Sequence, residues 1–524
     1  MGSIGFKIGV GQNPLLGLMG VLLLSALVFA PAVPAPPSGD DYVHIYRSQS
    51  GANWLSYFLE ADGREYRPWV RVSLAAEWWA SGGRAWVSHL SNLLLHLLVT
   101  SLVFLLAVEI GLTGRPALLA AALFALHPIH TYNVSAIMGR TDIWCSVFLL
   151  GAMLAAFRKR PLLCLGLFLM ALFSKETAVV FPILLALLLM IRGQLRSQRR
   201  LVAGGLLLLL AYFLFRFGVT PVESPGDLRV YLQSGPAALA RNLAYSFGSL
   251  VVPTGLYTIR AWLEAVPLLG QSSIMVAIVI TAGMVWRSRK GFPLSFWMGM
   301  IWTVVTLAPV ILLFQRRVLY LPSAGFCIAA AVVLSKTWGT RWGRLMTGAI
   351  LALLAGEIAL SSWEWNRAGN MNKEVLGSLA ARISRDDPQR SYLILNVPHG
   401  LGEAHLFTHD SLASALALEL ERPIDIRVIT RIQRSSAGSP VEVTQNSAGI
   451  TTRIQPGPLD YFVFDNPELL SAGGRRLPIG TVFRQGPLLT EVLETSDGGL
   501  VSAIQVNWAS LPENQTLLVL PEEE

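Results

Sequence analysis

The sequence contains little charge and few cysteines. Only 14% of its 524 residues are Asp, Glu, Lys or Arg, whereas 53% are hydrophobic. Ordinary soluble domains contain about 25% charged residues, so this composition excludes a soluble enzyme of several domains. The three cysteines, Cys145, Cys164 and Cys327, all lie in apolar runs and lack metal-binding spacing. They therefore predict neither a disulfide framework nor a zinc site.

Long apolar runs, separated by short basic breaks, fill the first 360 residues. We predict about eleven membrane spans from their length. They lie near residues 14–34, 90–110, 117–130, 141–157, 161–174, 177–191, 201–217, 271–286, 293–313, 319–336 and 344–362. The first run ends in the Pro/Ala-rich sequence PAVPAPP, so a cleaved signal peptide is an alternative for it. The fold class is a polytopic α-helical membrane protein.

Basic clusters predict the orientation of these spans, because cytoplasmic loops are enriched in Lys and Arg. With a cytoplasmic N-terminus, the clusters at 158–160, 192–200 and 287–290 all fall inside the cell. The region 237–256 must then remain peripheral or re-entrant. This assignment accounts for the net charge of +8 without nucleic acid as a partner. It also predicts that residues 161–191 form two short helices bent at Ser174, with a charged outer tip at Lys175 and Glu176.

The composition changes to that of a soluble protein near residue 363. SYLILNV (391–397) and IDIRVIT (424–430) predict strands on either side of a helix near 407–421, and further strands follow. We therefore divide the chain into a transmembrane domain, 1–362, and an extracytoplasmic α+β domain, 363–524. The first outer loop is expected at 35–89. Its tryptophans, Trp78, Trp79 and Trp86, are typical of an interfacial helix.

Ionisable residues gather at the predicted outer ends of the spans. Charged groups at membrane depth are costly and mark functional sites. The residues concerned are Asp40, Asp41, Glu65, Arg67, His89, His127, His130, Arg140, Asp142, Lys175, Glu176, Arg316, Arg317 and Tyr320. Because they lie on one side of the membrane, they predict an outer-facing site.

Three segments in this set carry a resemblance to a known family. They read FALHPIHTYNVSAIMGRTDIW (124–144), LFSKETAVVFP (172–182) and RRVLYLPSAGF (316–326). In this order they resemble the membrane glycosyltransferases of the GT-C class, in the branch of the TMTC-type and bacterial protein O-mannosyltransferase-like proteins. There the patterns look like HPxHxExV…GRxDLL, SKE and ERYLYLPS. Two positions depart from them, since Tyr132 and Arg316 stand where the family pattern has Glu.

The resemblance implies transfer of a sugar from a polyprenyl-phosphate carrier to a protein or envelope-glycan acceptor. Asp40 would be the general base, with Asp41 beside it. Lys175, Arg317 and Arg140 would bind the phosphate, with Tyr320 as a hydroxyl donor. The remaining residues would shape the site; they are Glu65, Arg67, His89, His127, His130, Asp142 and Glu176. We expect no required cofactor, although a divalent cation remains an alternative.

Two other classes of function stay open at this stage. A transporter or flippase of a lipid-linked substrate would place ionisable groups near the membrane midplane and show symmetric halves. A non-catalytic membrane scaffold would only present the C-terminal domain. The one-sided polar cluster and the absence of an internal repeat favour the transferase. Because a TMTC-type TPR tail is absent, we expect a bacterial inner membrane rather than the endoplasmic reticulum.

Overall fold

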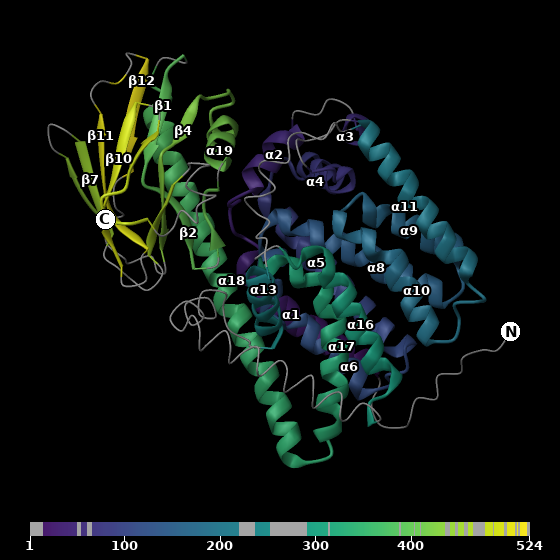
Figure 1. The fold of residues 1–524 in the computed structure, drawn as a ribbon. Coiled ribbons are helices and arrows are strands. Elements are labelled where there is room, and N and C mark those ends of the chain that lie inside the picture. Colours follow the sequence, from purple (N-terminus) through teal and green to yellow (C-terminus); the bar gives the residue numbers. More distant parts are fainter. Residues whose placement is uncertain are drawn as a thin grey trace.

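The fold is known from a computed structural model. It describes residues 14–49, 54–59, 65–219, 236–251, 291–312 and 315–386, and most of 389–520 with short gaps. A helical body and a β-rich tail lie side by side, and one long helix, α18 (Arg341–Ile383), joins them (Figure 1).

Six helices of the described residues are long and apolar enough to cross a membrane, which confirms a helical, membrane-like body. They are Pro14–Ala32 (α1 and η1), Ala85–Glu109 (α5), Ile137–Phe157 (η3 and α8), Arg199–Gly218 (within α11, Arg199–Val219), Arg316–Thr337 (η7 and α17) and α18. A seventh results if the bent pair Arg115–Ala125 (α6) and Pro128–Ser135 (η2 and α7) is one span. The count of eleven is not confirmed.

Shorter apolar helices account for three more predicted spans. They are Pro161–Leu172 (α9), Glu176–Ile191 (η4 and α10) and Leu294–Val310 (α16 and η6). The interruption between α9 and η4 lies where the sequence predicts a bend. The span predicted at 271–286 lies outside the described residues. The segment predicted to remain peripheral forms a helix, α13 (Pro236–Val251), as far as it is described.

A proline and a glycine shape the corner between α6 and α8. Pro128 disfavours helix at the preceding residue, and α6 accordingly ends before His127, with a bend of 45°. At Gly139, a Cβ atom would lie only 2.2 Å from the carbonyl oxygen of Asn133. Only glycine permits this close approach. The corner holds the HPxH and GRxD segments together.

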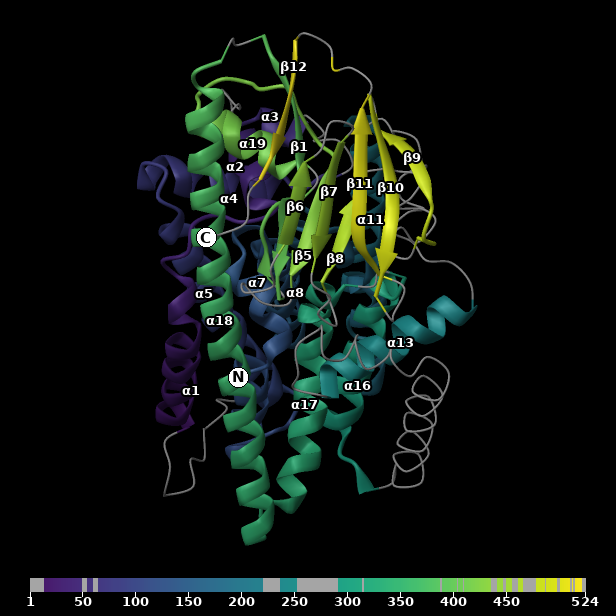
Figure 2. The ribbon, with the colours of Figure 1, turned by 90° about the vertical axis from the view of Figure 1, so that its left-hand side faces the viewer.

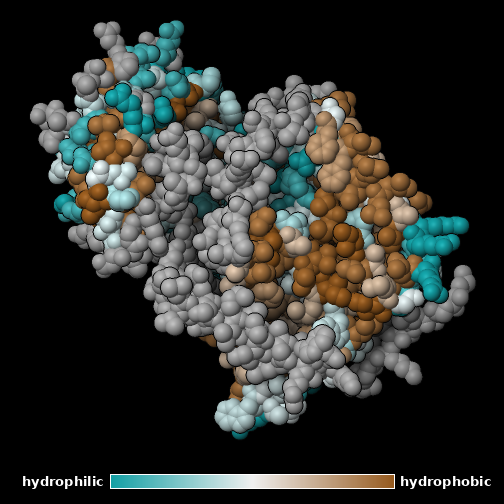
Figure 3. Space-filling model, in the orientation of Figure 1, coloured by the Kyte–Doolittle hydropathy of each residue, from teal (hydrophilic) through white to brown (hydrophobic). Residues whose placement is uncertain are grey.

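The helical body exposes apolar side chains around its circumference. Exposed leucines are frequent on three helices: Leu15, Leu23 and Leu27 on α1, Leu207, Leu210 and Leu214 on α11, and Leu345, Leu353 and Leu360 on α18. On the face of the molecule seen in Figure 3, hydrophobic residues dominate the coloured surface of the body, while hydrophilic residues are frequent on the tail. Water would not favour such a surface, but a lipid bilayer does.

Helix α18 contains 43 residues and is therefore about 65 Å long, roughly twice the ~30 Å hydrocarbon core of a membrane. Figure 2 shows it extending from the lower end of the body to the tail. The predicted domain division at 362/363 falls inside this continuous helix. Its C-terminal half contributes Leu376, Leu379 and Ile383 to the core of the tail.

The described residues of the tail form three sheets. In the first, β1 (Ser391–Leu395) pairs in parallel with β12 (Gln515–Val519) and β4 (Ile426–Val428). The second has the order β3 (Ala404–His405), β2 (Val397–Leu401), β5 (Thr430–Arg434), β8 (Tyr461–Phe464). The third is antiparallel, in the order β6 (Val441–Gln445), β7 (Gly449–Ile454), β11 (Val501–Trp508), β10 (Leu488–Thr495), β9 (Val482–Gln485).

The helix predicted at 407–421 is shorter in the structure, where α19 covers Ser411–Glu419. The residues just before it instead contact the start of α2 (Asp41–Gln49). Two further helices of the first loop, α3 (Ser56–Leu59) and α4 (Pro68–Ser81), follow α2 in the chain. The N–H of Gly39 donates to the carbonyl of Leu406 (2.6 Å), and the ring of Tyr42 stacks on Phe407 with centroids 6.2 Å apart. The tail is therefore docked on the segment that carries the acidic pair.

Candidate active site

The two aspartates of the acidic pair have different surroundings. Asp41 is 1% exposed, and its carboxylate accepts the N–H groups of Met138 (2.9 Å) and Ser38 (3.2 Å). Burial raises the pKa of Asp41 to about 7, although these N–H groups act in the opposite direction. Asp41 therefore fastens the start of α2 to the corner before α8, and its oxygens face the main chain rather than a substrate.

Asp40 is accessible, with 39% of its side chain exposed. One carboxylate oxygen accepts the hydroxyl of Thr408 from the tail (2.6 Å), and the other lies 3.9 Å from Nη1 of Arg317. Partial burial alone would raise the pKa of Asp40. Arg317, the Thr408 hydroxyl and nearby His44 and His405 outweigh that effect and hold the pKa below its usual value of 3.8. Asp40 is consequently ionised at neutral pH.

The side-chain hydrogen bonds of Arg317 go to neutral groups, although the Asp40 carboxylate lies 3.9 Å away. Its Nη1 donates to the hydroxyl of Tyr132 (2.9 Å), its Nε donates to Gln315 (2.9 Å), and its guanidinium lies 5.2 Å from the centroid of the Tyr132 ring. Tyr132 is one of the two departures from the family pattern. The phenol orients the guanidinium but leaves its charge in place. A glutamate at this position would instead neutralise that charge.

Lys175 and Glu176 do not pair with each other. Lys175 donates to Asp142 at 2.5 Å, and both side chains are nearly buried. Glu176 accepts from Arg67 at 3.0 Å, and Arg67 also donates to Glu65 at 2.9 Å. Burial would lower the pKa of Arg67, but the two glutamates raise it overall. Because the backbone at Lys175 is extended (φ −161°, ψ 144°), adjacent side chains point in opposite directions.

These groups share one electrostatic environment. Arg317 interacts electrostatically with the carboxylates of Asp40, Asp142 and Glu65. Arg67 and Arg317 are also close enough for their charges to interact. The structure therefore brings together residues from the first outer loop, the start of α8, the α9–η4 junction and the start of η7. We call this set the outer charge cluster; it comprises Asp40, Glu65, Arg67, Asp142, Lys175, Glu176 and Arg317.

Arg140 occupies a separate, buried position. Its three guanidinium nitrogens donate to Glu77 (2.7 Å), to the carbonyl of Ser88 (3.1 Å) and to the carbonyl of Ile137 (3.0 Å). The side chain is 0% exposed. A phosphate role for Arg140 stays a prediction that these contacts do not support, because each of its three guanidinium nitrogens already donates to an acceptor in the protein.

Tyr320 and His96 form another buried pair. His96 Nε2 lies 3.2 Å from the carbonyl of Ala125, and its Nδ1 lies 2.8 Å from the Tyr320 hydroxyl. Since a carbonyl can only accept, Nε2 carries the proton and Nδ1 accepts from Tyr320. The predicted hydroxyl donor is thus already engaged inside the body.

The remaining predicted histidines are also internal. His127 Nδ1 accepts the N–H of Ile129 (3.4 Å), which caps η2, and its Nε2 donates to the carbonyl of Leu250 (2.9 Å). His130 hydrogen bonds with Ser323 (2.9 Å). His89 is buried near the main chains of Ala35 and Ser135, and Arg316, the second departure from the family pattern, is 6% exposed near His127 and His130.

Sequence reasoning missed two partners, Thr408 and Glu77. Thr408 lies 368 positions from Asp40, so no local pattern links them. Glu77 could have been found, because it is an ionisable residue in an apolar stretch. The segment HLSNLLLH, which contains His96, resembles the family, but the resemblance does not predict the bond from Tyr320 to His96. Among the described residues, no group of three or more His, Cys, Asp or Glu side chains could hold a metal ion. The divalent cation stays an untested alternative.

Among known proteins, this chain is similar to several that are named protein O-mannosyl-transferases. The human protein O-mannosyl-transferase TMTC4 is 27% identical over 399 residues, covering 60% of this chain and 53% of its own length. F38B6.6 of Caenorhabditis elegans, also a protein O-mannosyl-transferase, is 26% identical over 250 residues and is matched over 34% of its length. Xenopus laevis tmtc2 is 40% identical over 111 residues, or 13% of its length. The motif resemblance is confirmed. The chain spans about half or less of these relatives.

Solved structures with a similar arrangement include ArnT from Cupriavidus metallidurans bound to undecaprenyl phosphate. It is 14% identical, with a TM-score of 0.46 over 82% of this chain and 96% of that chain. The Archaeoglobus fulgidus oligosaccharyltransferase tethered to an acceptor peptide is 14% identical, with a TM-score of 0.41 over 72% of this chain and 62% of that chain. No family model matches the sequence.

Proposed function

We propose that this protein transfers a sugar from a polyprenyl-phosphate carrier to a hydroxyl of a protein or glycan acceptor, on the outer face of a bacterial inner membrane. The observation that carries the proposal is the half-exposed Asp40 carboxylate 3.9 Å from Arg317, within the outer charge cluster. A base beside a fixed cation suits a reaction in which a hydroxyl loses a proton while a phosphate gains charge. The curated relatives carry the name of this reaction class.

The proposed step forms one bond and breaks one. The acceptor oxygen attacks the anomeric carbon, the bond from that carbon to the phosphate oxygen breaks, and Asp40 takes the hydroxyl proton. Asp40 is the base because it is accessible and ionised, and geometry takes precedence over a matched pKa. Asp41, with the better-matched pKa, is a positioning residue because the main chain occupies its oxygens.

The leaving phosphate would gain negative charge next to Arg317. Two N–H groups of a guanidinium can clasp phosphate oxygens, whereas Lys175 and Arg67 would contribute as charges already balanced by carboxylates. Arg317 has a carboxylate partner too, but the Asp40 oxygen lies 3.9 Å from its Nη1, beyond hydrogen-bond distance, and Tyr132 holds the guanidinium without adding negative charge. Arg317 is therefore the principal phosphate ligand in this proposal.

The test uses purified protein in lipid nanodiscs with radiolabelled polyprenyl-phosphate sugars and a native membrane extract as acceptor. We expect label transfer by the wild type and a loss of about 10²–10⁴-fold for Asp40→Asn, the usual contribution of a general base. Asp425→Asn, at an exposed aspartate in the tail, is the matched control and should transfer normally. Equal transfer by Asp40→Asn would remove Asp40 as the base. No transfer from any donor, in an extract competent with a known transferase, would overturn the proposed function.

A further inference from the structure

A cavity of about 780 Å³ lies between the outer helices of the body and the tail. Its lining comes from α2 and α4 on one side and from α18 and α19 on the other, together with the loop after α19. The volume is within the range of small-molecule sites, about 300–1,000 Å³. No residue of the outer charge cluster lines it, so this cavity is an additional feature.

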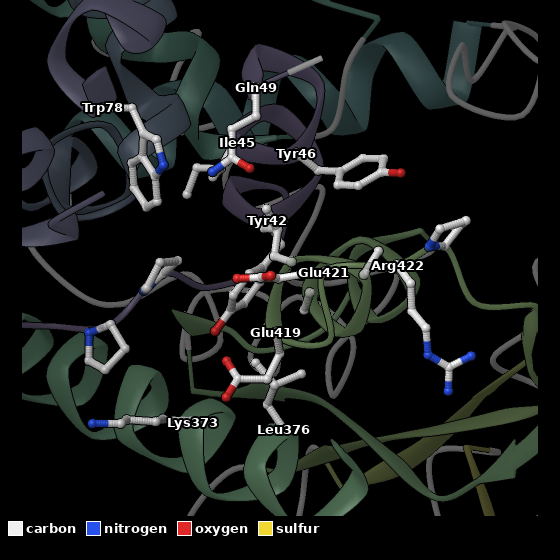
Figure 4. A pocket seen from close by; sticks show the side chains of 16 residues that line it. Tyr42, Ile45, Tyr46, Gln49, Trp78, Lys373, Leu376, Glu419, Glu421 and Arg422 are labelled. Carbon is white, nitrogen blue, oxygen red and sulfur yellow. The ribbon is translucent and has the colours of Figure 1, made fainter. Parts of the chain in front are cut away.

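The lining combines aromatic rings with hydrogen-bonding side chains. Figure 4 shows Trp78 and Tyr46 on one side and Glu419 on the other, with Tyr42 and Glu421 between them. Lys373 and Arg422 also line it, so the formal charge of these four ionisable groups is zero. Such a balance gives no preference for a strongly charged ligand.

Glu421 violates local preferences at the end of α19. Helix α19 ends at Glu419 with Leu420 as its C-cap, so Glu421 occupies the following position, where glycine is favoured. Its φ of +53° is unfavourable for a residue with a side chain, and two carboxylates at a helix C-terminus oppose the helix dipole. Sequences break such rules mainly at functional sites. The carboxylate of Glu421 therefore has a role that helix formation does not explain.

The cavity is next to the proposed base along the chain. Pro36, Pro37 and Tyr42 line it on both sides of Asp40 in sequence. The Cα atoms of Tyr42 and Asp40 can be no more than about 7 Å apart, because two residues span only that length. A ligand seated in the cavity thus lies within a few sugar or peptide units of the outer charge cluster.

We infer that this cavity binds the acceptor, and that the acceptor is a glycan; the inference rests on the proposed function. Sugar hydroxyls both donate and accept, which suits carboxylate and amide side chains such as Glu421 and Gln49. Sugar C–H faces pack on aromatic rings such as Trp78. An extended peptide would need free main-chain partners. The lining offers few, since most of it is helical and Pro36, Pro37 and Pro423 lack an N–H.

The test measures binding without the donor, so that it does not depend on catalysis. Full-length protein in nanodiscs is titrated with fluorescently labelled oligosaccharides of about four to six units, released from the source cell envelope, and with labelled tryptic peptides of similar mass. We expect saturable binding of oligosaccharides only. Glu421→Gly and Trp78→Ala should each weaken it at least tenfold. Glu374→Gln, at an exposed glutamate on α18 outside the lining, should bind as the wild type does.

Glu421→Gly separates binding from folding, because glycine is the favoured residue there and the variant should melt at the same or a higher temperature. In transfer assays it should raise the KM for the glycan acceptor and leave the KM for the donor unchanged. Binding of peptides alone, or unaltered oligosaccharide binding in both variants, would overturn the inference. Oligosaccharide binding without any sugar transfer would instead support the cavity and refute the proposed function. Asp40→Asn should retain binding in either case.

Discussion

The outer charge cluster and the interior of the helical body both contain ionisable residues, but several of these are accessible in the cluster, whereas most are buried in the interior. In the outer charge cluster, the side chains of Asp40 and Arg317 are each more than one-third exposed, and their charged groups lie 3.9 Å apart. Inside the body, Arg140 and Glu77 form a 2.7 Å bond with Arg140 fully buried, and Tyr320 donates to a buried His96. The first arrangement leaves charge available to a ligand. In the second, the three guanidinium nitrogens of Arg140 and the hydroxyl of Tyr320 donate to other parts of the helical body.

The family motifs therefore contain two kinds of residue: some join helices inside the body, and others belong to the outer charge cluster. In GRTD (139–142), the arginine fastens the corner before α8 to α4 and α5, while Asp142 points to the cluster and pairs with Lys175. Buried polar contacts stabilise only if they are complete, and their loss is costly. Each kind of residue therefore makes a different prediction when it is mutated.

After Asp40→Asn, the largest effect is expected from Arg317→Met. Loss of the cation that faces the leaving phosphate should lower kcat/KM for transfer by about 10²–10³-fold. The melting temperature should stay near that of the wild type, because the side chain is 36% exposed. Transfer assays and thermal unfolding in nanodiscs measure both. The matched control is Arg367→Met, at an exposed arginine on α18. Normal transfer by a folded Arg317→Met protein would show that Arg317 does not act on the leaving phosphate.

Glu77→Gln should affect stability rather than chemistry. It leaves the buried charge of Arg140 without a carboxylate, and Glu77 also accepts from Ser88 and Ser91. Loss of one partner of a buried pair typically costs about 3–5 kcal/mol, and we expect the lower end because Glu77 is 20% exposed. A lower melting temperature with near-normal donor KM in the folded fraction is the expected result. A selective rise in donor KM would instead favour a phosphate role for Arg140.

The pH dependence of transfer distinguishes the two aspartates. With Asp40 as base, kcat/KM should not fall between pH 8 and about pH 5, because the pKa of Asp40 lies below 3.8. If Asp41 were the base, the rate would be halved near pH 7 and fall about tenfold for each further pH unit. Initial rates with a single acceptor, in nanodiscs, decide between these profiles.

Asp41 should instead control the pH dependence of stability. Its pKa is raised from 3.8 to about 7, so the folded chain binds this proton more tightly than the unfolded chain does. Its contribution to stability is fully present below about pH 4 and is lost as the pH rises towards 7. In Asp41→Asn this part of the pH dependence should disappear from melting temperatures measured between pH 4 and 8. An unchanged dependence would contradict the assignment.

Tyr132→Glu tests whether this departure keeps Arg317 available. A glutamate at this position should pair with Arg317 and reduce its attraction for phosphate, with an expected rise of about tenfold in donor KM. Tyr132→Phe removes only the 2.9 Å hydrogen bond and should raise it only a few-fold. A donor KM that falls in Tyr132→Glu would show that the family residue assists this reaction here too.

The smallest effect is expected from Thr408→Val. It removes the hydroxyl that the tail donates to Asp40, and the loss of one such bond is worth about 1 kcal/mol or roughly a five-fold drop in kcat. Thr408→Ser should restore the rate, which a purely steric role of the tail would not predict. If neither substitution changes the rate, the tail docks beside the site without positioning Asp40.

Several features follow from the amino-acid sequence alone. Apolar run length predicts a helical membrane body, because a helix in lipid must satisfy its own backbone. Short apolar runs such as the one in SYLILNV predict strands of the tail. Charged residues in apolar surroundings indicate the outer site, since their burial is costly. The ordered motifs indicate the family resemblance, which the relatives confirm.

Which motif residues are accessible follows only from the folded structure. Asp40 and Asp41 are adjacent and chemically identical in sequence, but the N–H groups of Met138 and Ser38 make Asp41 a buried anchor. The contact of Thr408 with Asp40 joins residues 368 positions apart. The cavity beside α19 likewise depends on how the tail docks on α2. Local sequence patterns report periodicity and burial, but contacts between distant segments follow from packing of the whole chain.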